Sequence, residues 1–170
     1  VFHCPYCDGY ELHDQPVAIL AEGAAALHVA KLLRVLSDRV TICTNGESDF
    51  TPDEQAQLDR LGIHIVPTPI ARAEGEGTQI ERIVFADDNT LPIAGAFIRL
   101  TSTHHSGFAA ALGCTIDEQN FVQVNPMGAT SVPGVYAAGD LTSRMRQIIF
   151  AASQGAAAGI GINMALLEED

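Results

Sequence analysis

Residues 16–43 limit the folds open to this chain more than any other segment. "PVAIL" at 16–20 and "RVTIC" at 39–43 are apolar runs of strand length, and "AAALHVAKLLRVLSD" at 24–38 places its apolar residues at helical spacing. A helix between two such strands returns the chain to the same edge of the sheet, so the strands should run parallel. The sequence therefore predicts an α/β fold.

The next segment predicts a helix and then a second kind of sheet. Thr51 is a typical N-cap and Pro52 suits a first helical turn, so we expect a helix from there to Leu61, followed by a strand at "IHIVP". Turn residues then separate three β-type runs, which predicts an antiparallel meander; the runs are 69–74, 80–87 and 90–93.

The C-terminal part opens with a polar, histidine-containing segment at 101–107, which we interpret as a crossing between domains. Strands are expected at "FVQV" (121–124) and "GVYAAGD" (134–140), and a long helix at 146–167. That helix has no charged residue from Gln147 to Leu167, and about 20 apolar residues can span a bilayer. Its glycines, alanines and polar side chains instead favour a buried core helix and no membrane.

Charge and cysteine content narrow the class of partner and compartment. The net charge is −12, and the nine Lys and Arg residues are scattered along the chain. We therefore expect neither nucleic acid nor an anionic membrane as a partner. No signal-peptide pattern follows Val1, and the absent initiator Met suggests part of a longer protein. Four cysteines in 170 residues are too few for a disulfide scaffold, so we expect a reducing, cytoplasmic compartment.

Cys4 and Cys7 form a C-x-x-C motif with three readings. A zinc site would need two further ligands, and only isolated cysteines and scattered histidines are available, so no metal is expected. A structural disulfide between them would close a very small loop and would therefore stabilise the folded state only a little. A redox pair is favoured, because this spacing lets two sulfurs meet and lets one resolve a mixed disulfide formed by the other. Asp8 could serve as the proton source, or it could be only a turn residue before Gly9.

The loop between the first strand and helix is a modified dinucleotide fingerprint. The usual G-x-G-x-x-G/A reads here as Ala21-x-Gly23-x-x-Ala26, and Glu22 stands where a diphosphate would approach. The second strand leads into "ICTNGESD", which has no arginine for a 2′-phosphate and carries Glu47 and Asp49. We therefore expect no tight NADPH binding and, at best, weakened NAD(P)H binding overall.

A third candidate site lies around residues 139–147. Gly139 and Asp140 end a run of small residues, and the Asp140 carboxylate could accept hydrogen bonds from a ribose or ribityl chain. The helix expected to start near Arg146 and Gln147 would offer amide groups to negative charge on a bound ring. On these physical grounds alone, a packing role for the loop is equally open.

Four segments follow one another along the chain: "CPYCDGYE", the glycine loop, "TSVPGVYAAGD" and "RQIIFAASQGAAAG". In this order and spacing they resemble the low-molecular-weight thioredoxin reductases and their close relatives. The resemblance covers almost the whole chain. The resemblance implies a Rossmann-like three-layer nucleotide-binding domain at 1–103, carrying the C-x-x-C, and the C-terminal segment of an FAD-binding domain at 104–170. The family's N-terminal FAD-binding half would then be missing from this sequence.

The resemblance also implies a cofactor and residue roles. FAD would be the cofactor, Cys7 would face the flavin, Cys4 would exchange with substrate, and Asp8 would be the acid. The flavin-binding set would be Gly139 and Asp140 at the ribityl chain, with Arg146 and Gln147 beside the ring. The expected substrate is a small-molecule or protein dithiol or disulfide, and a homodimer is compatible with the resemblance.

The departures in the nucleotide loop look more like the dithiol oxidases of this group, which pass electrons from flavin to oxygen and need no nicotinamide. In that branch His104 or His105 could deprotonate a substrate thiol, although an exposed interdomain pair is the simpler interpretation. Two alternatives stay open: an NAD(P)H-dependent disulfide reductase, and a non-catalytic redox switch or degenerate nucleotide-binding module.

Overall fold

The structure is a computed structural model that describes residues 1–99 and 103–169. The chain divides into two compact units, Val1–Leu100 and Thr101–Asp170. The domain boundary expected after residue 103 is three residues from this division. Residues 100–102 lie outside the described residues, and with them the start of the polar crossing segment at 101–107.

The first unit is built on a four-stranded parallel sheet of order β3-β2-β1-β7. Strand β1 pairs in parallel with β2, and the helix α2 connects them, so the expected β-α-β unit is confirmed. Strand β7 pairs with the other side of β1 and was not predicted. The bounds are β1 (Val17–Leu20), α2 (Gly23–Arg34), β2 (Val40–Cys43), β3 (His64–Val66) and β7 (Gly95–Ile98).

Local signals also account for the helix α3 (Pro52–Arg60). Thr51 and Glu54 form a capping box, in which the Thr51 amide donates to the Glu54 carboxylate at 2.9 Å and the Glu54 amide donates to the Thr51 hydroxyl at 3.3 Å. The expected meander is confirmed as a separate antiparallel sheet of order β4-β5-β6, with bounds β4 (Ile70–Glu76), β5 (Gln79–Phe85) and β6 (Thr90–Pro92).

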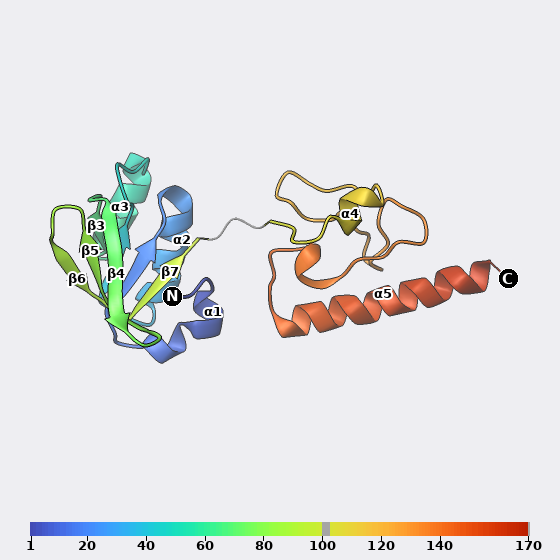
Figure 1. Cartoon of the computed structure of the whole chain (residues 1–170), viewed down its shortest axis with the longest axis horizontal. Helices are drawn as coiled ribbons and strands as arrows, with labels where there is room; N and C mark the ends of the chain where they lie inside the picture. The colour runs from blue at the N-terminus through green and yellow to red at the C-terminus, as the bar shows by residue number, and fades with distance from the viewer. Residues whose placement is uncertain (100–102, 170) are drawn as a thin grey trace. The chain divides into compact units, whose positions relative to one another are not determined.

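The parallel sheet is the middle layer of three. Val17 and Ile19 of β1 pack in one apolar cluster with Leu27 of α2, whereas Ala18 packs in a second cluster with Ile83 of the meander. Successive residues of a strand point to opposite faces, so one strand serves both clusters. Figure 1 shows α2 and α3 on one side of this sheet and the β4-β5-β6 meander on the other. The expected three-layer α/β architecture is therefore present.

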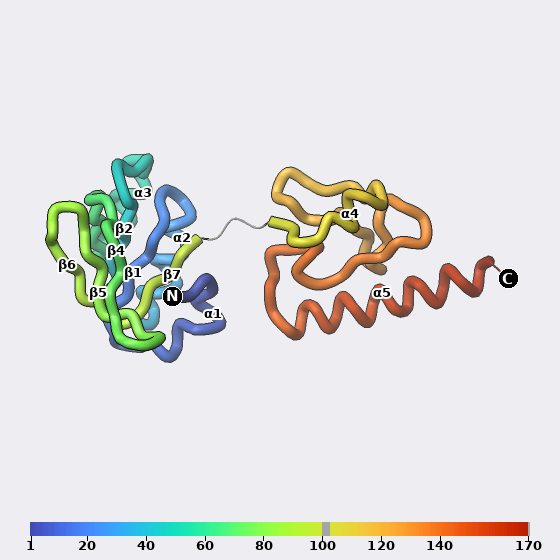
Figure 2. Tube along the Cα trace, in the orientation of Figure 1, coloured from blue at the N-terminus to red at the C-terminus, as the bar shows by residue number. Residues whose placement is uncertain are grey.

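The second unit is mostly irregular up to its last helix, as the trace in Figure 2 shows. Its elements are α4 (Phe108–Ala111), the short 3₁₀ helix η2 (Gly139–Leu141) and α5 (Ile148–Glu168). The strands expected at 121–124 and 134–140 are wrong, since only single bridges join Ile116 to Val122 and Ala129 to Tyr136. Gly134 and Gly139 have φ of 76° and 77°, which turns the backbone out of the extended region at both ends of 134–140.

The helix α5 begins two residues later than expected, and the expectation that it is buried is wrong. Ile148 is 91% exposed and Ile149 71%, and within the described helix only Ala158 and Gly161 are buried. The helix is apolar on all sides, but its own unit covers one face: a Cβ at Gly161 would lie 2.7 Å from the Met127 carbonyl oxygen. Close backbone contact therefore occurs, but on one side only.

By length and composition, α5 is also the one helix in the described part of the chain that could cross a membrane. Core helices of soluble proteins pass the same test, so this is weak support for a membrane span. That no membrane is involved stays a prediction.

Candidate redox and cofactor sites

Cys4 and Cys7 are brought together by one short helix, α1 (Pro5–Asp8). Cys4 is its N-cap with extended backbone, Pro5 occupies the first helical position, and the Cys7 amide donates to the Cys4 carbonyl at 3.1 Å. This single turn places the two sulfurs 2.8 Å apart, with the Cys7 thiol donating to Cys4 Sγ. Both cysteines are free thiols, and Cys7 is exposed.

The hydrogen bond makes the two sulfurs unequal. It is the largest cause that raises the pKa of Cys7 from its ordinary 9.0 to about 11, followed by partial desolvation and the charges of Cys4 and Asp8. Cys7 therefore keeps its proton to higher pH than an ordinary thiol, and Cys4 Sγ accepts the hydrogen bond from that proton. Because thiolates are the attacking species in exchange, this arrangement favours Cys4 as the nucleophile.

The residues after Cys7 hold this turn in place. Gly9 is buried, and a Cβ there would lie 2.4 Å from the Pro5 carbonyl oxygen and 2.8 Å from Leu36 Cδ1. Only glycine fits between α1 and Leu36, so close packing explains the glycine that follows Asp8. Asp8 is half-buried beside Cys7, and its role as an acid stays a prediction.

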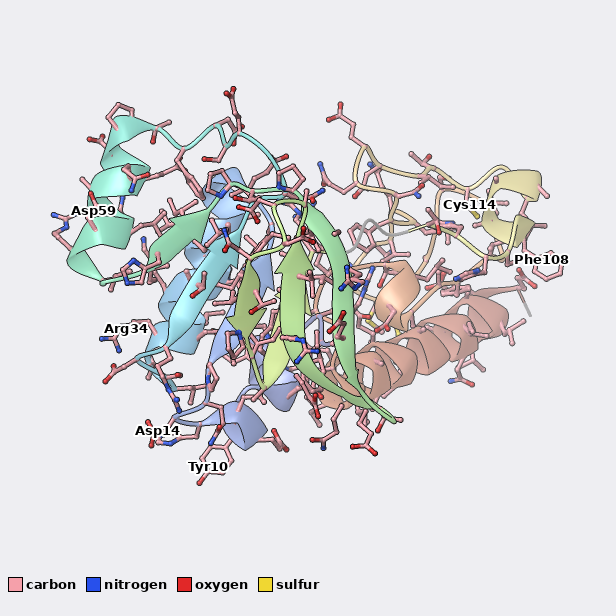
Figure 3. The ribbon with its side chains drawn as sticks, turned by 60° about the vertical axis from the view of Figure 1, so that its left-hand side comes forward. Tyr10, Asp14, Arg34, Asp59, Phe108 and Cys114 are labelled. Carbon is pink, nitrogen blue, oxygen red and sulfur yellow. The ribbon has the colours of Figure 1, made fainter. Side chains whose placement is uncertain are left out.

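Two tyrosines lie close to the cysteines in sequence, and both are exposed. Tyr6 lies between the two cysteines in sequence and is 74% exposed, and Tyr10 is 78% exposed with its ring 6.2 Å from that of His13. Figure 3 shows Tyr10 projecting outward near Asp14. Within this unit, the segment that carries the two thiols therefore exposes two aromatic side chains.

We expect mild oxidation to join Cys4 to Cys7 in a reversible disulfide, because the two sulfurs are already in contact. Before oxidation, alkylation should modify Cys4 ahead of Cys7, and Cys7 should react fully only as the pH rises toward 11. Cys4→Ala removes the main cause of the raised pKa and should shift Cys7 labelling to lower pH. Mass spectrometry of labelled peptides measures both.

Cys43 is the internal control for that experiment. It is 1% exposed, and burial alone raises its pKa to about 11, so it should stay unlabelled in the folded chain. A disulfide that contained Cys43 or Cys114 in place of Cys4 or Cys7 would show that the redox pair is wrongly assigned.

The nucleotide-type loop keeps the shape of a dinucleotide loop but not its charge. Gly23 has φ of +57°, which favours glycine, and Ala26 is fully buried, which allows close packing of α2. Ala21 is half-buried, and the N-cap Glu22 is exposed and makes no side-chain capping bond. A Cβ at Gly23 would lie 3.0 Å from Asp49 Oδ1, so the Asp49 carboxylate stands against the glycine.

A cavity of about 550 Å³ opens beside this loop, at the carboxyl ends of β1 and β2. Ligands of open α/β sheets bind at this edge. Glu22 and the buried thiol of Cys43 line the cavity, and its lining, all within the described residues, contains no Lys or Arg. The structure thus brings Glu22 and Asp49 to the position where a phosphate would need positive charge.

The flavin-type loop lies in the second unit. Asp140 is exposed in η2 directly after Gly139, and Gln147 is the N-cap of α5 without a side-chain capping bond. The Arg146 amide donates to the Arg144 carbonyl at 2.9 Å. Sequence reasoning missed Thr142 and Gln154, which bond to this loop. The only signal for Gln154 was a polar residue within an apolar helix.

The remaining candidates show no further chemistry in the described residues. No group of three or more His, Cys, Asp or Glu there could hold a metal ion, and the absence of a metal stays a prediction. His104 Nε2 lies 2.5 Å from the Asn120 carbonyl oxygen, which binds that ring to backbone, and Cys114 is buried. A base role for His104 is therefore not proposed.

Residues 1–155 match the pyridine nucleotide-disulphide oxidoreductase family. The chain belongs to this family. The match spans the C-x-x-C turn, the nucleotide-type loop and the Gly139-Asp140 loop, so all three candidate sites lie within the residues that match the family.

Individual members of the family agree in sequence and in fold. The chain is 28% identical to the thioredoxin reductase sirT of Leptosphaeria maculans and 28% identical to thioredoxin reductase of Mycolicibacterium smegmatis, covering 100% and 98% of this chain. It spans about half the length of these curated relatives, 56% of each. The crystal structure of TrxB from Bacillus anthracis superposes with a TM-score of 0.90 at 33% identity, covering 99% of this chain and 57% of that one.

Proposed function

We propose that the chain is part of an FAD-dependent thiol-disulfide oxidoreductase, similar to thioredoxin reductase, that moves electrons between a dithiol or disulfide substrate and flavin. The observation that carries the proposal is the accessible Cys4–Cys7 pair at 2.8 Å, with Cys7 donating to Cys4. Membership of an oxidoreductase family named for disulfides supports the same reading.

In the oxidising direction, a substrate thiolate attacks Cys4 of the Cys4–Cys7 disulfide, and Cys7 leaves as a thiolate and takes up a proton. The second substrate thiolate then attacks the substrate sulfur of the mixed disulfide and releases Cys4. The substrate loses two electrons and two protons, and the cysteine pair gains them. Asp8, beside Cys7, is proposed to hold or release the proton at Cys7. FAD, when bound, would accept the two electrons from the pair.

The second unit has residues that fit part of such a cofactor. The side chain of Gln147 leaves the first-turn amides of α5 uncapped, so they can support negative charge. Asp140 presents an exposed carboxylate, an acceptor suited to hydroxyl groups, from a turn that its neighbour Gly139 makes tight. We propose that these residues, with Arg146, hold the ribityl chain and ring.

We further propose that NADPH does not drive the enzyme and that it works as a dithiol oxidase. The carboxylates of Glu22 and Asp49 at the nucleotide-type loop support this. The alternative is an NAD(P)H-dependent disulfide reductase, which the names of the two thioredoxin reductase relatives favour. A small-molecule or protein dithiol is the proposed partner. The reducing cytoplasm is the proposed compartment, consistent with four free cysteines.

A flavin spectrum tests the core of the proposal. The complete polypeptide, purified and scanned, should show the absorbance of bound flavin, and a dithiol added under nitrogen should bleach it. A preparation with no flavin band after incubation with FAD would instead support a non-catalytic redox switch built on Cys4 and Cys7.

The 170-residue chain alone should hold FAD weakly or not at all. Residues 139–147 can contact the ribityl chain and ring, whereas relatives are about twice as long and can supply a separate grip for the diphosphate. We expect a dissociation constant at least about a hundredfold weaker than in the complete polypeptide, corresponding to two tenfold losses in affinity. Titration of FAD followed by flavin fluorescence measures this, and submicromolar binding to the isolated chain would contradict it.

A further inference from the structure

Gln154 on α5 joins the helix to the Gly139-Asp140 loop. Its Oε1 accepts a hydrogen bond from the Gly139 amide at 2.8 Å, and the Thr142 hydroxyl lies 3.2 Å from the same oxygen. Gln154 is half-buried, so these contacts are partly shielded from water. One side-chain oxygen thus meets both ends of the turn that carries Asp140.

The turn is also closed on itself. The Thr142 amide and the Thr142 hydroxyl both lie 2.9 Å from the Gly139 carbonyl oxygen. Gly139 adopts φ of +77°, and a Cβ there would lie 3.6 Å from Ala151 Cβ on α5. Backbone and hydroxyl bonds therefore shape the turn, and Gln154 fixes it to the helix.

We propose that Gln154 is the positioning residue for Asp140. Gly139 and Thr142 flank Asp140 and Leu141 in the chain, and both are held at Gln154 Oε1, so the path of the backbone at Asp140 is set by that oxygen. The Asp140 carboxylate itself is exposed and is therefore open to a hydroxyl group of a ligand. This inference rests on the proposed function in so far as Asp140 is the flavin ligand.

Amide exchange in the 170-residue chain tests the anchoring without any cofactor. Gln154→Leu removes the acceptor at similar size, so exchange of the Gly139 amide should accelerate about tenfold or more. Gln154→Glu keeps an acceptor oxygen and should retain the protection. Asn163→Leu, the same loss of an amide at an exposed position of α5, is the matched control and should change nothing. Unchanged Gly139 exchange in Gln154→Leu would overturn the anchoring.

Flavin affinity in the complete polypeptide tests the link to Asp140. Gln154→Leu should weaken FAD binding about tenfold, and Gln154→Glu should stay within about threefold of the wild type. In an Asp140→Asn background, Gln154→Leu should add no further loss, since a residue that acts through Asp140 has nothing left to position.

Two outcomes separate this inference from the proposed function. Independent, multiplying losses from Gln154→Leu and Asp140→Asn would overturn the positioning role while leaving FAD as the cofactor. A wild-type polypeptide that binds no FAD would overturn the proposed function and the link to flavin, whereas Gly139 exchange would still decide whether Gln154 holds the turn.

Discussion

Cys7→Ser should abolish electron transfer between substrate and flavin in the complete enzyme, by on the order of a thousandfold or more, as expected when the reacting sulfur of a covalent pathway is removed. Serine cannot form the Cys4–Cys7 disulfide. Within the described residues no other thiol can replace it, because Cys43 and Cys114 are buried. Anaerobic stopped-flow recording of flavin absorbance after mixing with a dithiol measures the loss.

Cys4→Ser should fail at a different step. It leaves Cys7 as a thiol but removes the sulfur that exchanges with substrate, so a mixed disulfide with substrate should not accumulate. Cys114→Ala also removes a thiol, from a buried position in the other compact unit, and should keep the wild-type rate within about twofold, because a buried thiol takes no part in exchange. A Cys7→Ser enzyme that still reduces flavin with dithiol would place the redox centre elsewhere.

NADPH should reduce the flavin of the complete enzyme slowly, at least about a hundredfold more slowly than a dithiol does at matched concentration, if two unfavourable contacts each weaken binding about tenfold. Binding a nucleotide diphosphate needs close backbone amides and nearby positive charge. Here Glu22 lines the cavity and the Asp49 carboxylate stands against Gly23. NADH lacks the 2′-phosphate and should suffer only the penalty at the loop.

Charge-removing variants show which carboxylates matter. Glu22→Gln combined with Asp49→Asn should raise NADH affinity at least about tenfold, since both changes relieve repulsion of the diphosphate. Glu47→Gln removes one charge from the segment that carries Asp49 and is compared with Asp49→Asn alone. The atoms that a Cβ at Gly23 would meet all belong to Asp49, so Glu47→Gln is the matched control and should have a smaller effect than Asp49→Asn. Rapid, saturable bleaching of wild-type flavin by micromolar NADPH would overturn the oxidase proposal and restore an ordinary reductase.

Local sequence patterns were sufficient where the structure depends on near neighbours. The β-α-β unit, the Thr51 cap and the meander were all predictable, because strand and helix periodicity and capping act over a few residues. The Cys4–Cys7 contact belongs to the same class, since one helical turn is enough to bring residues three apart together.

Predictions failed where a short segment needed a distant partner. The run at 95–98 becomes strand β7 only because it pairs with β1, which lies far away in the chain. The runs at 121–124 and 134–140 are apolar like the run at 95–98, but each takes part in a single bridge only. In the second run, Gly134 and Gly139 have positive φ, which ends the extended backbone on both sides. Burial of α5 was also mispredicted, since apolar composition states what a helix can bury and not what is present to cover it.

By itself, then, the sequence determined the layered α/β class and pointed to the Cys4–Cys7 pair, the nucleotide-type loop and the Gly139-Asp140 loop as candidate sites. Only the tertiary structure decided that Asp49 stands against Gly23, and that Gln154 holds Gly139 and Thr142. The physical reason is distance along the chain. The helix α2 and the strand β2 separate Asp49 from the glycine loop, and Gln154 lies on a helix that begins after the Gly139 turn. No periodicity or capping rule therefore links Asp49 to Gly23, or Gln154 to Gly139. Such contacts exist only once the fold has brought separate elements to the same place.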